Sequence, residues 1–281
     1  MSKKQDNFEG VFDDMPSDVY HKAVGVSRSS ACKAYDRPDV FYYEDILGNK
    51  TSNPAFAYGI AFHTAVLEPE KYELEVAVEP NINKRTKDGK AEFEEWYSAN
   101  KGKNIITQAD HEAIMRARDS VNAHPMAKKI MAQGVAERSF FTKHELLEDA
   151  TIKARTDWLS HGVIVDLKSA RSASTADFAK QMTSTSYIVQ PAWYLDVAKR
   201  CGEEVDEFWY IAVEKTAPYS VAVYRMSPNS HETRISEFLY EQVLIKYNQL
   251  KKDGLYPSYN NNEVTDIELP HWFSRNFKEI F

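Results

Sequence analysis

The chain has 281 residues, 43% hydrophobic and 27% charged, which is typical of a soluble globular protein with one large domain or two modest ones. No apolar run approaches the ~20 residues of a membrane-spanning helix, and residues 1–14 lack the apolar centre of a signal peptide. Two cysteines are too few for a disulfide scaffold or an iron–sulfur cluster, so a reduced, cytoplasmic setting is expected. The net charge of −7 argues against a protein that coats nucleic acid, but it allows an enzyme with a local basic channel.

Helix signals dominate the first half of the chain. Residues 1–19 are expected to form a flexible lead, and residues 20–130 a mainly helical part. Ser27 is a suitable N-cap for the first helix, and Thr107 caps a later one. The helices expected here cover about residues 27–35, 55–67, 90–98 and 108–122, with a polar, basic loop at 80–90.

Strand signals begin at about residue 135. Strands with helices laid against them predict one α/β domain over residues 20–281, with its sheet-containing catalytic core in residues 135–281. The N-terminal helical region would wrap this core. The strands expected are residues 135–143, 150–158, 162–168, 208–214 and 220–226, and the helices are 175–182, 187–200 and 231–252.

Two carboxylates and an amine lie in the second and third predicted strands. Apolar neighbours surround Asp166 in residues 163–168, so a buried strand is expected, in which an unpaired charge is costly. Lys168 is two residues further along and therefore points to the same side. A tight turn at residues 160–162 would bring Asp157 beside Asp166. Mg²⁺ sites of phosphoryl-transfer enzymes use one or two carboxylates, so this pattern predicts a metal-dependent nuclease. The alternative is an ordinary Asp–Lys pair on a surface hairpin.

His63 and Glu137 are two further candidates for the metal. On a helix, His63 shares one face with Gly59 and Leu67, and the small glycine would let the helix approach the sheet closely. The imidazole could complete a coordination sphere, or it could be a core histidine bonded to the backbone. Glu137 begins the first strand, where it could be a further carboxylate toward the metal or an edge-strand charge.

Gln190 and Tyr194 are four residues apart, hence on one helix face. An amide and a phenol that project together suit contacts to a DNA phosphate or to an attacking water. Pro191 is expected to kink this helix, and a half-buried amphipathic helix is the alternative reading of the pair.

Two groups of residues are candidates for contacts to phosphate. Ser27, Arg28 and Ser29 begin a helix, where hydroxyls and free backbone N–H groups form an anion site, although capping alone explains Ser27. Lys84 and Arg85 belong to the basic loop and could contact DNA or form a solvated surface. A pocket for the 5′-phosphate of an exonuclease substrate is expected near Arg28.

Six segments, in this order and spacing, resemble the RecE family of prophage exonucleases (exonuclease VIII, C-terminal nuclease domain). The resemblance runs from about Tyr20 to the C-terminus. More broadly the chain is similar to the PD-(D/E)xK nuclease superfamily, which includes lambda exonuclease and the RecB nuclease domain. The segments are Gly25-Val26-Ser27-Arg28-Ser29, Gly59-Ile60-Ala61-Phe62-His63 with Val66-Leu67-Glu68-Pro69-Glu70, Asn83-Lys84-Arg85-Thr86, Arg155-Thr156-Asp157, Asp166-Leu167-Lys168 and Val189-Gln190-x3-Tyr194.

The resemblance implies an α/β fold with a PD-(D/E)xK, restriction-endonuclease-like central mixed sheet flanked by helices. It implies two Mg²⁺ ions and 5′-to-3′ digestion of linear double-stranded DNA, leaving 3′ single-stranded tails for recombination by annealing. Mn²⁺ is expected to substitute, because oxygen and imidazole donors tolerate both ions.

The resemblance also implies roles for particular residues. Metal ligands would be His63, Asp157 and Asp166, together with the Leu167 carbonyl. Lys168 would be the catalytic amine, with Gln190 and Tyr194 as a supporting pair. The proline that names the superfamily motif is Thr156 in this chain.

Partners follow from the same resemblance. It implies a ring-shaped homo-oligomer that encloses DNA ends and works with a RecT-like single-strand annealing protein, in the cytoplasm of a bacterial host of a phage or prophage. Two alternatives stay open: a structure- or site-specific DNA endonuclease of the same superfamily, and a non-catalytic DNA-binding recombination scaffold.

Overall fold

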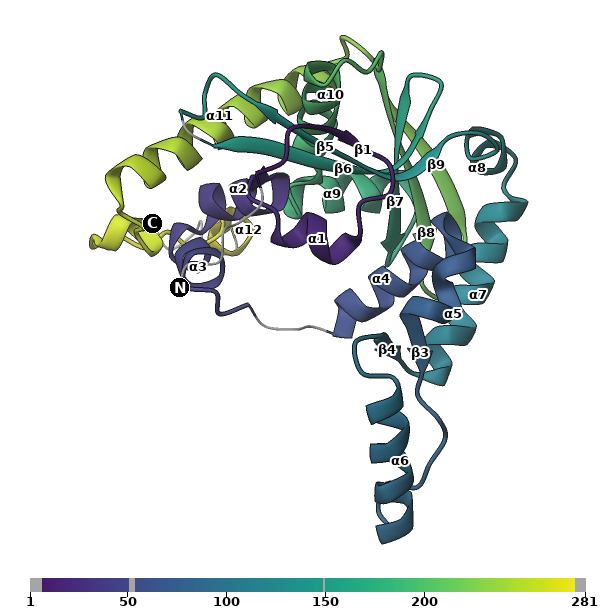
Figure 1. The fold of residues 1–281 in the computed structure, drawn as a ribbon. Coiled ribbons are helices and arrows are strands. Elements are labelled where there is room, and N and C mark those ends of the chain that lie inside the picture. The colour runs from purple at the N-terminus through teal and green to yellow at the C-terminus, as the bar shows by residue number, and fades with distance from the viewer. Residues whose placement is uncertain (1–6, 51–53, 149, 276–281) are drawn as a thin grey trace.

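A mixed seven-stranded sheet forms the centre of the computed structural model, which describes residues 7–50, 54–148 and 150–275 (Figure 1). Its strands are β1 (Gly10–Phe12), β2 (Val26–Ser27), β5 (Val135–Lys143), β6 (Thr151–Ser160), β7 (Val163–Ala170), β8 (Glu207–Glu214) and β9 (Val221–Met226). The spatial order is β1-β5-β6-β7-β8-β9, and β2 pairs with β6 off this path.

Both pairing directions occur in this sheet. Strands β5, β6 and β7 form an antiparallel meander, whereas β8 runs parallel to β7 and β9 antiparallel to β8. A parallel pair needs a crossover connection, and here it consists of α9 (Thr175–Ser184), a 3-10 turn η3 (Tyr187–Val189) and α10 (Gln190–Arg200). The expected central mixed sheet is confirmed.

Helices cover both faces of the sheet. Ile164 of β7 belongs to a buried cluster with α9, α10, α2 (Arg28–Asp36) and α11 (His231–Asp253). Val165 and Leu167 point the other way, into a cluster with α4 (Pro54–Leu67), α7 (Gln108–Ala123) and α8 (Pro125–Ile130). Consecutive residues of β7 therefore serve opposite layers, as alternation along a strand requires. Among the helices so described, none has the length and apolar character needed to cross a membrane.

Helix α6 (Lys87–Ala99) stands away from the body (Figure 1). It lies in the connection between two strands that pair in parallel, β3 (Val76–Val78) and β4 (Asn104–Ile106). We call residues 79–103 the arm. The remaining short elements are α1 (Ser17–Lys22), α3 (Pro38–Phe41), η1 (Tyr42–Ile46), η2 (Pro69–Lys71), α5 (Tyr72–Glu75), η4 (Tyr259–Asn262) and α12 (His271–Ser274).

The N-terminal lead differs from the flexible segment expected over residues 1–19. Residues 1–6 lie outside the described part of the chain, but β1 pairs with β5 and α1 begins at Ser17. Phe8 and Phe12 pack on Phe141, each with ring centroids less than 6 Å apart, and these contacts order the lead. Short strands of this kind carry no periodic signal of their own.

Two smaller expectations about helices are wrong. Pro191 does not kink a helix, because α10 begins at Gln190 and Pro191 lies in its first turn, where a missing backbone N–H costs nothing. A methyl group on Gly59 would meet no described atom within 4 Å, so close approach to the sheet does not explain this glycine. The predicted caps Ser27 and Thr107 are confirmed: each hydroxyl accepts a backbone N–H of its helix.

Candidate active site

The β6–β7 hairpin positions the two aspartates. His161 and Gly162 form its two-residue turn, and both have positive φ, as a type I′ turn requires. Pairing runs from Ser160 back to Trp158 and ends there. Beyond this pairing, the backbone N–H of Leu167 donates a hydrogen bond to the Asp157 carboxylate at 2.7 Å instead of to a backbone carbonyl. The strands therefore separate at Asp157, and its side chain enters the opening.

A second strand explains why this opening persists. β6 pairs with β7 at one end and with β2 at the other, through Ile152 and Lys153. Among the described strands, residues 154–157 of β6 therefore pair with neither β2 nor β7, because they lie between the two paired stretches. We call this opening the fork. Trp193 of α10 closes one side of the fork, where its indole N–H donates to the Lys153 carbonyl at 3.0 Å.

His63, Glu137 and Asp157 come together at the fork. One ligand atom of each lies within 4.8 Å of the others, and His63 Nδ1 is 3.7 Å from Asp157 Oδ2. Glu137 and Asp157 are unpaired between the pairs Ala136–Trp158 and Arg138–Thr156 of β5 and β6, and Glu137 has a left-handed backbone conformation (φ 52°). Its carboxylate accepts a hydrogen bond from Arg155 Nε at 2.5 Å. The helix α4, the strand β5 and the strand β6 each supply one member of the cluster.

Burial shifts the pKa values of all three members of this cluster toward their neutral forms. Burial and, second, the neighbouring Asp166 charge raise the pKa of Asp157 to about 7. Burial also raises the pKa of Glu137, with Asp157 as the second cause, and lowers the pKa of His63. Two carboxylates that repel each other beside a neutral imidazole are a donor set that fits Mg²⁺ or Mn²⁺.

Asp166 and Lys168 lie beside this cluster on β7. Asp166 is 1% exposed; the Gln190 amide donates to its Oδ1, and the Lys168 ammonium lies against its Oδ2. Asp166 Oδ2 and Gln190 Oε1 accept no well-oriented hydrogen bond from the described residues. The main chain of Leu167, the residue between Asp166 and Lys168 in β7, contacts the His63 ring. Asp166 Oδ2 already has the Lys168 ammonium beside it, whereas Gln190 Oε1 is buried without a donor among the described residues; such an oxygen is costly, and a cation would relieve that cost.

Tyr187 and Arg28 extend the site away from the carboxylates. Lys168 Nζ is 4.8 Å and Arg28 Cζ 5.8 Å from the centroid of the Tyr187 ring. Arg28 directly follows β2, donates to the Ser186 carbonyl at 3.3 Å, and has a buried Nε that lacks an acceptor among the described residues. Burial raises the pKa of Tyr194 above its usual range, which keeps the phenol protonated. Lys168 and Arg28 thus lie on the Tyr187 ring, and the Tyr194 phenol is close to Arg28.

A family model described as "PDDEXK-like domain of unknown function (DUF3799)" matches residues 29–265. The chain belongs to this family. A crystal structure of a protein from Eubacterium rectale, named "Putative exonuclease", is similar in fold, with a TM-score of 0.61 and 14% sequence identity. The match covers 92% of this chain and 96% of that chain. No curated protein matches the chain. The PDDEXK-like fold and the carboxylate–lysine site together support a nuclease.

Most of the predicted site residues lie close together in this PDDEXK-like chain. His63, Glu137 and Asp157 meet at the fork, with Asp166 and Lys168 next to them. The Leu167 main chain, Gln190, Tyr194 and Arg28 surround this group. For Glu137, its place beside His63 and Asp157 favours the reading as a further carboxylate of the site.

Four other predicted residues lie apart from it or have local roles. Ser27 caps α2, and Ser29 is exposed and shares a hydrogen bond with Ser27 at 3.2 Å. Lys84 and Arg85 belong to the arm; Lys84 forms an ion pair with Glu79 and lies over the Phe93 ring. Their role in DNA binding stays a prediction.

Sequence reasoning missed Arg155 and Tyr187. Arg155 is two residues before Asp157 in β6, and this spacing alone could have nominated it as a neighbour of the carboxylates. Tyr187 carries no such local signal, because it reaches Lys168 only through the crossover between β7 and β8.

Proposed function

We propose that this protein is a metal-dependent exodeoxyribonuclease that digests linear double-stranded DNA from the 5′ end and leaves 3′ single-stranded tails. The convergence of His63, Glu137 and Asp157 beside the Asp166–Lys168 pair carries the proposal. The resemblance to the RecE family supports the direction of digestion and a RecT-like annealing protein as the partner that takes up the tails.

The metal would be held by His63, Asp157, Asp166 and the Leu167 carbonyl, with Glu137 as an additional carboxylate. When bound, Mg²⁺ or Mn²⁺ supplies Lewis-acid polarisation of the phosphate and neutralises developing charge. Arg155 keeps Glu137 directed at the cluster, and Gln190 keeps Asp166 in place by its amide hydrogen bond. Partners of this kind orient ligands and raise metal affinity.

Lys168 orients the attacking water as an ammonium group or, as the neutral amine, accepts its proton. Asp166 and the Tyr187 ring hold the ammonium group on two sides, so its position is well defined. In the reaction, the water oxygen forms a bond to phosphorus, the bond from phosphorus to the 3′-oxygen breaks, and that oxygen takes up a proton. The product is a nucleotide with a 5′-phosphate, released from the end of one strand.

Arg28 would select ends that carry a 5′-phosphate. Its buried Nε without an acceptor and its place beside Tyr187 suit a phosphate next to the scissile one. Arg28→Ala should reduce the digestion of 5′-phosphorylated duplex more than that of 5′-hydroxyl duplex. An equal loss on both substrates would remove Arg28 from end recognition.

The decisive experiment compares linear duplex DNA with a closed circle, in Mg²⁺ and in EDTA. Lys168→Ala is the inactive variant expected, and Lys143→Ala, an exposed lysine at the end of β5, is its matched control. Loss of the linear DNA alone, dependent on metal and on Lys168 and with nucleotides released from the 5′ end, supports the proposal. Cutting of the circle indicates an endonuclease, and DNA that is bound but uncut indicates a scaffold.

A further inference from the structure

Two cations of β6 hold the N-terminal segment of residues 15–23 against the sheet. Lys153 and Arg155 are two residues apart and therefore point to the same side of this strand. Lys153 Nζ donates to the carbonyls of Tyr20 and Ala23 at 2.9 and 2.8 Å. These carbonyls lie at the end of α1, where a helix leaves carbonyls without intrahelical partners, so the ammonium group takes the place of those partners.

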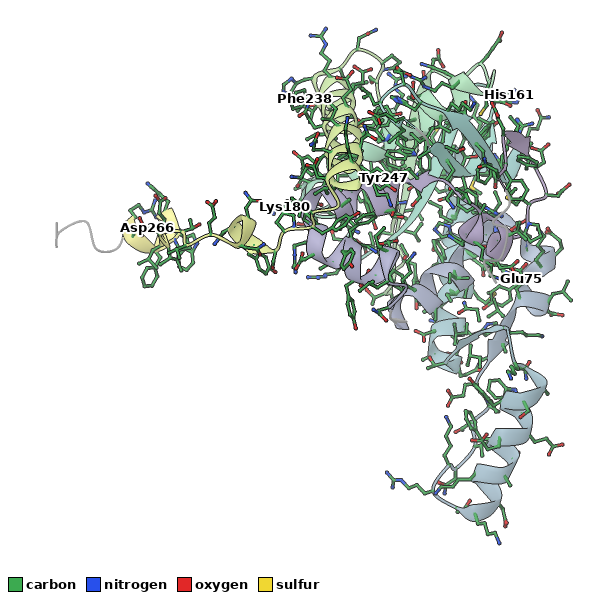
Figure 2. All side chains as sticks on the ribbon, turned by 60° about the vertical axis from the view of Figure 1, so that its left-hand side comes forward. Glu75, His161, Lys180, Phe238, Tyr247 and Asp266 are labelled. Carbon is green, nitrogen blue, oxygen red and sulfur yellow. The ribbon has the colours of Figure 1, made fainter. Side chains whose placement is uncertain are left out.

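Arg155 holds the beginning of the same segment. Its Nη1 donates to the Met15 carbonyl at 2.9 Å, just before α1 begins. This segment lies against the sheet (Figure 1), whereas the residues around Asp266 lead away from the body (Figure 2). Helix α1 has six residues, and isolated helices shorter than ~12–15 residues are marginal in water. Its contacts with β6 therefore hold it in place.

The ring of Tyr20 lies under both cations. Lys153 Nζ is 4.9 Å and Arg155 Cζ 5.6 Å from the ring centroid, within the range of cation–π attraction. Tyr20 is 7% exposed and packs edge-on against Phe141, with ring centroids 5.7 Å apart. Among the described residues Lys153 forms no ion pair with a carboxylate, so the two carbonyls and this ring compensate the burial of its charge.

Each cation also contacts one part of the active site. Arg155 Nε donates to the Glu137 carboxylate, one of the three groups of the metal cluster. Lys153 pairs in the sheet with the last residue of β2, directly before Arg28. A methyl group on Gly25 would lie 3.1 Å from Lys153 Cδ, so the chain before β2 fits closely against this side chain. The Tyr20 ring is thus connected to the metal ligands by one cation and to Arg28 by the other.

We propose that Tyr20 is a positioning residue of the active site, which acts through Arg155 on the metal cluster and through Lys153 on Arg28. Without the ring, both cations lose a contact that balances their burial and shift from their positions. Glu137 and Arg28 then lose their orientation. The inference rests on the proposed function, since that function assigns the cluster to metal binding and Arg28 to the recognition of 5′-phosphate.

Substitutions at the ring and at each cation test the two connections. Tyr20→Leu removes the ring and Tyr20→Phe keeps it. Arg155→Ala removes the connection to the cluster, and Lys153→Met removes the connection to β2 while keeping an unbranched side chain. Tyr72→Leu is the matched control, because Tyr72 is 9% exposed and belongs to the buried cluster with α4 and α7.

Two quantities would be measured on the full-length protein, and neither requires digestion. The first is the affinity for Mn²⁺ without DNA, by titration calorimetry. The second is the preference for 5′-phosphorylated over 5′-hydroxyl duplex DNA, from binding in EDTA followed by fluorescence anisotropy. Circular dichroism checks the fold of each variant. Tyr20→Met, whose long side chain fills more of the space, carries the same comparison if Tyr20→Leu does not fold.

Tyr20→Leu should weaken Mn²⁺ binding by about tenfold, as for other residues that orient a ligand, and should reduce the preference for 5′-phosphate. Tyr20→Phe and Tyr72→Leu should leave both quantities unchanged. When Arg155→Ala is already present, Tyr20→Leu should cause no further loss of Mn²⁺ affinity, because residues that act through one contact are not additive. When Lys153→Met is present, it should cause no further loss of the preference.

A folded Tyr20→Leu variant with either quantity at the wild-type value would overturn the inference. Additive losses in the double variants, or an equal loss in Tyr72→Leu, would overturn it as well. A wild type that binds Mn²⁺ but digests no DNA would reject the proposed nuclease alone, and the Mn²⁺ comparison would still decide the role of Tyr20. A wild type that binds no Mn²⁺ would overturn both.

Discussion

The fork and the arm differ in the burial of their charged side chains. At the fork, carboxylates and an ammonium group are buried in a sheet covered by helices on both faces, and Asp166 is 1% exposed. On the arm, charged and aromatic side chains lie on a helix that buries one glycine. Buried charges are tolerated where partners or a cation compensate them, so the fork is organised for chemistry. The arm has no such enclosure.

The largest expected effect comes from removing a carboxylate at the fork. Asp157→Asn keeps the shape of the side chain but removes a ligand charge, and it should lower the rate of duplex digestion by roughly 10³-fold. Asp88→Asn, on the arm, should leave the rate unchanged. The measurement is release of nucleotides from linear DNA in Mg²⁺; a rate in Asp157→Asn near that of the wild type would contradict the proposed site.

Asp157 should also make the metal-free protein sensitive to pH. Its pKa is raised from 3.8 to about 7 on folding, so its contribution to stability is present below about pH 4 and is lost as pH rises through 7. In EDTA at pH 8, Asp157→Asn should therefore be more stable than the wild type, by about 2–4 kcal/mol. Mg²⁺ should stabilise the wild type and have little effect on the variant. Denaturant unfolding at pH 5 and pH 8 would measure this, and a variant less stable than the wild type at pH 8 would refute it.

Two tryptophans compare the packing of the two regions. Trp193 is fully buried, packs edge-on against Tyr240 and donates to the Lys153 carbonyl, so Trp193→Ala should cost about 3–5 kcal/mol of unfolding free energy. Trp96→Ala on the arm should cost about 0.5 kcal/mol or less in dilute protein. Thermal or urea unfolding measures both. Similar losses in the two variants would show that the arm is packed as firmly as the sheet.

Much of the fork was predictable because its signals are local. Apolar residues around Asp166 indicated a buried strand, and a short turn before it placed Asp157 on the facing strand; both features are observed. What could not be predicted depends on pairing over long distances. β2 meets β6 through Val26 and Ile152, and two paired residues are too few to give a pattern. β2 forms one side of the fork, and Arg28 directly follows it, so neither the fork nor the position of Arg28 could be predicted without β2.

The arm shows the opposite limit of sequence reasoning. Phe93, Trp96 and Tyr97 recur at helical spacing, which ordinarily indicates a buried face. The helix was predicted, but its exposure could not be, because periodicity reports which side chains share a face and not whether anything covers that face. Tyr187 illustrates the same limit at the fork, since its contact with Lys168 arises only from the crossover.

Two amide side chains, one at the fork and one on the arm, provide a comparison with a smaller expected effect. Gln190 donates to the buried Asp166, so Gln190→Ala should lower metal affinity or activity by about 10–100-fold, as for other residues that orient a ligand. Asn83, whose side chain accepts from the Arg85 backbone on the arm, is the matched amide, and Asn83→Ala should leave both quantities unchanged. Titration of Mg²⁺ against the digestion rate distinguishes them. An unchanged Mg²⁺ requirement and rate in Gln190→Ala would exclude a role in positioning Asp166.

Two glycines test whether the arm unfolds separately from the sheet. Gly134 has a φ of 158°, and a methyl group there would collide with the Trp158 indole and the Leu159 carbonyl. Gly134→Ala should therefore lower the global unfolding free energy by about 1–3 kcal/mol. A methyl group on Gly89 would collide with the Asn83 carbonyl within the arm. Gly89→Ala should speed amide hydrogen exchange in residues 84–90 and leave exchange in β6 and β7 unchanged, because weakly packed segments open on their own. If Gly89→Ala instead sped exchange throughout the sheet, the arm and the fork would be one cooperative unit.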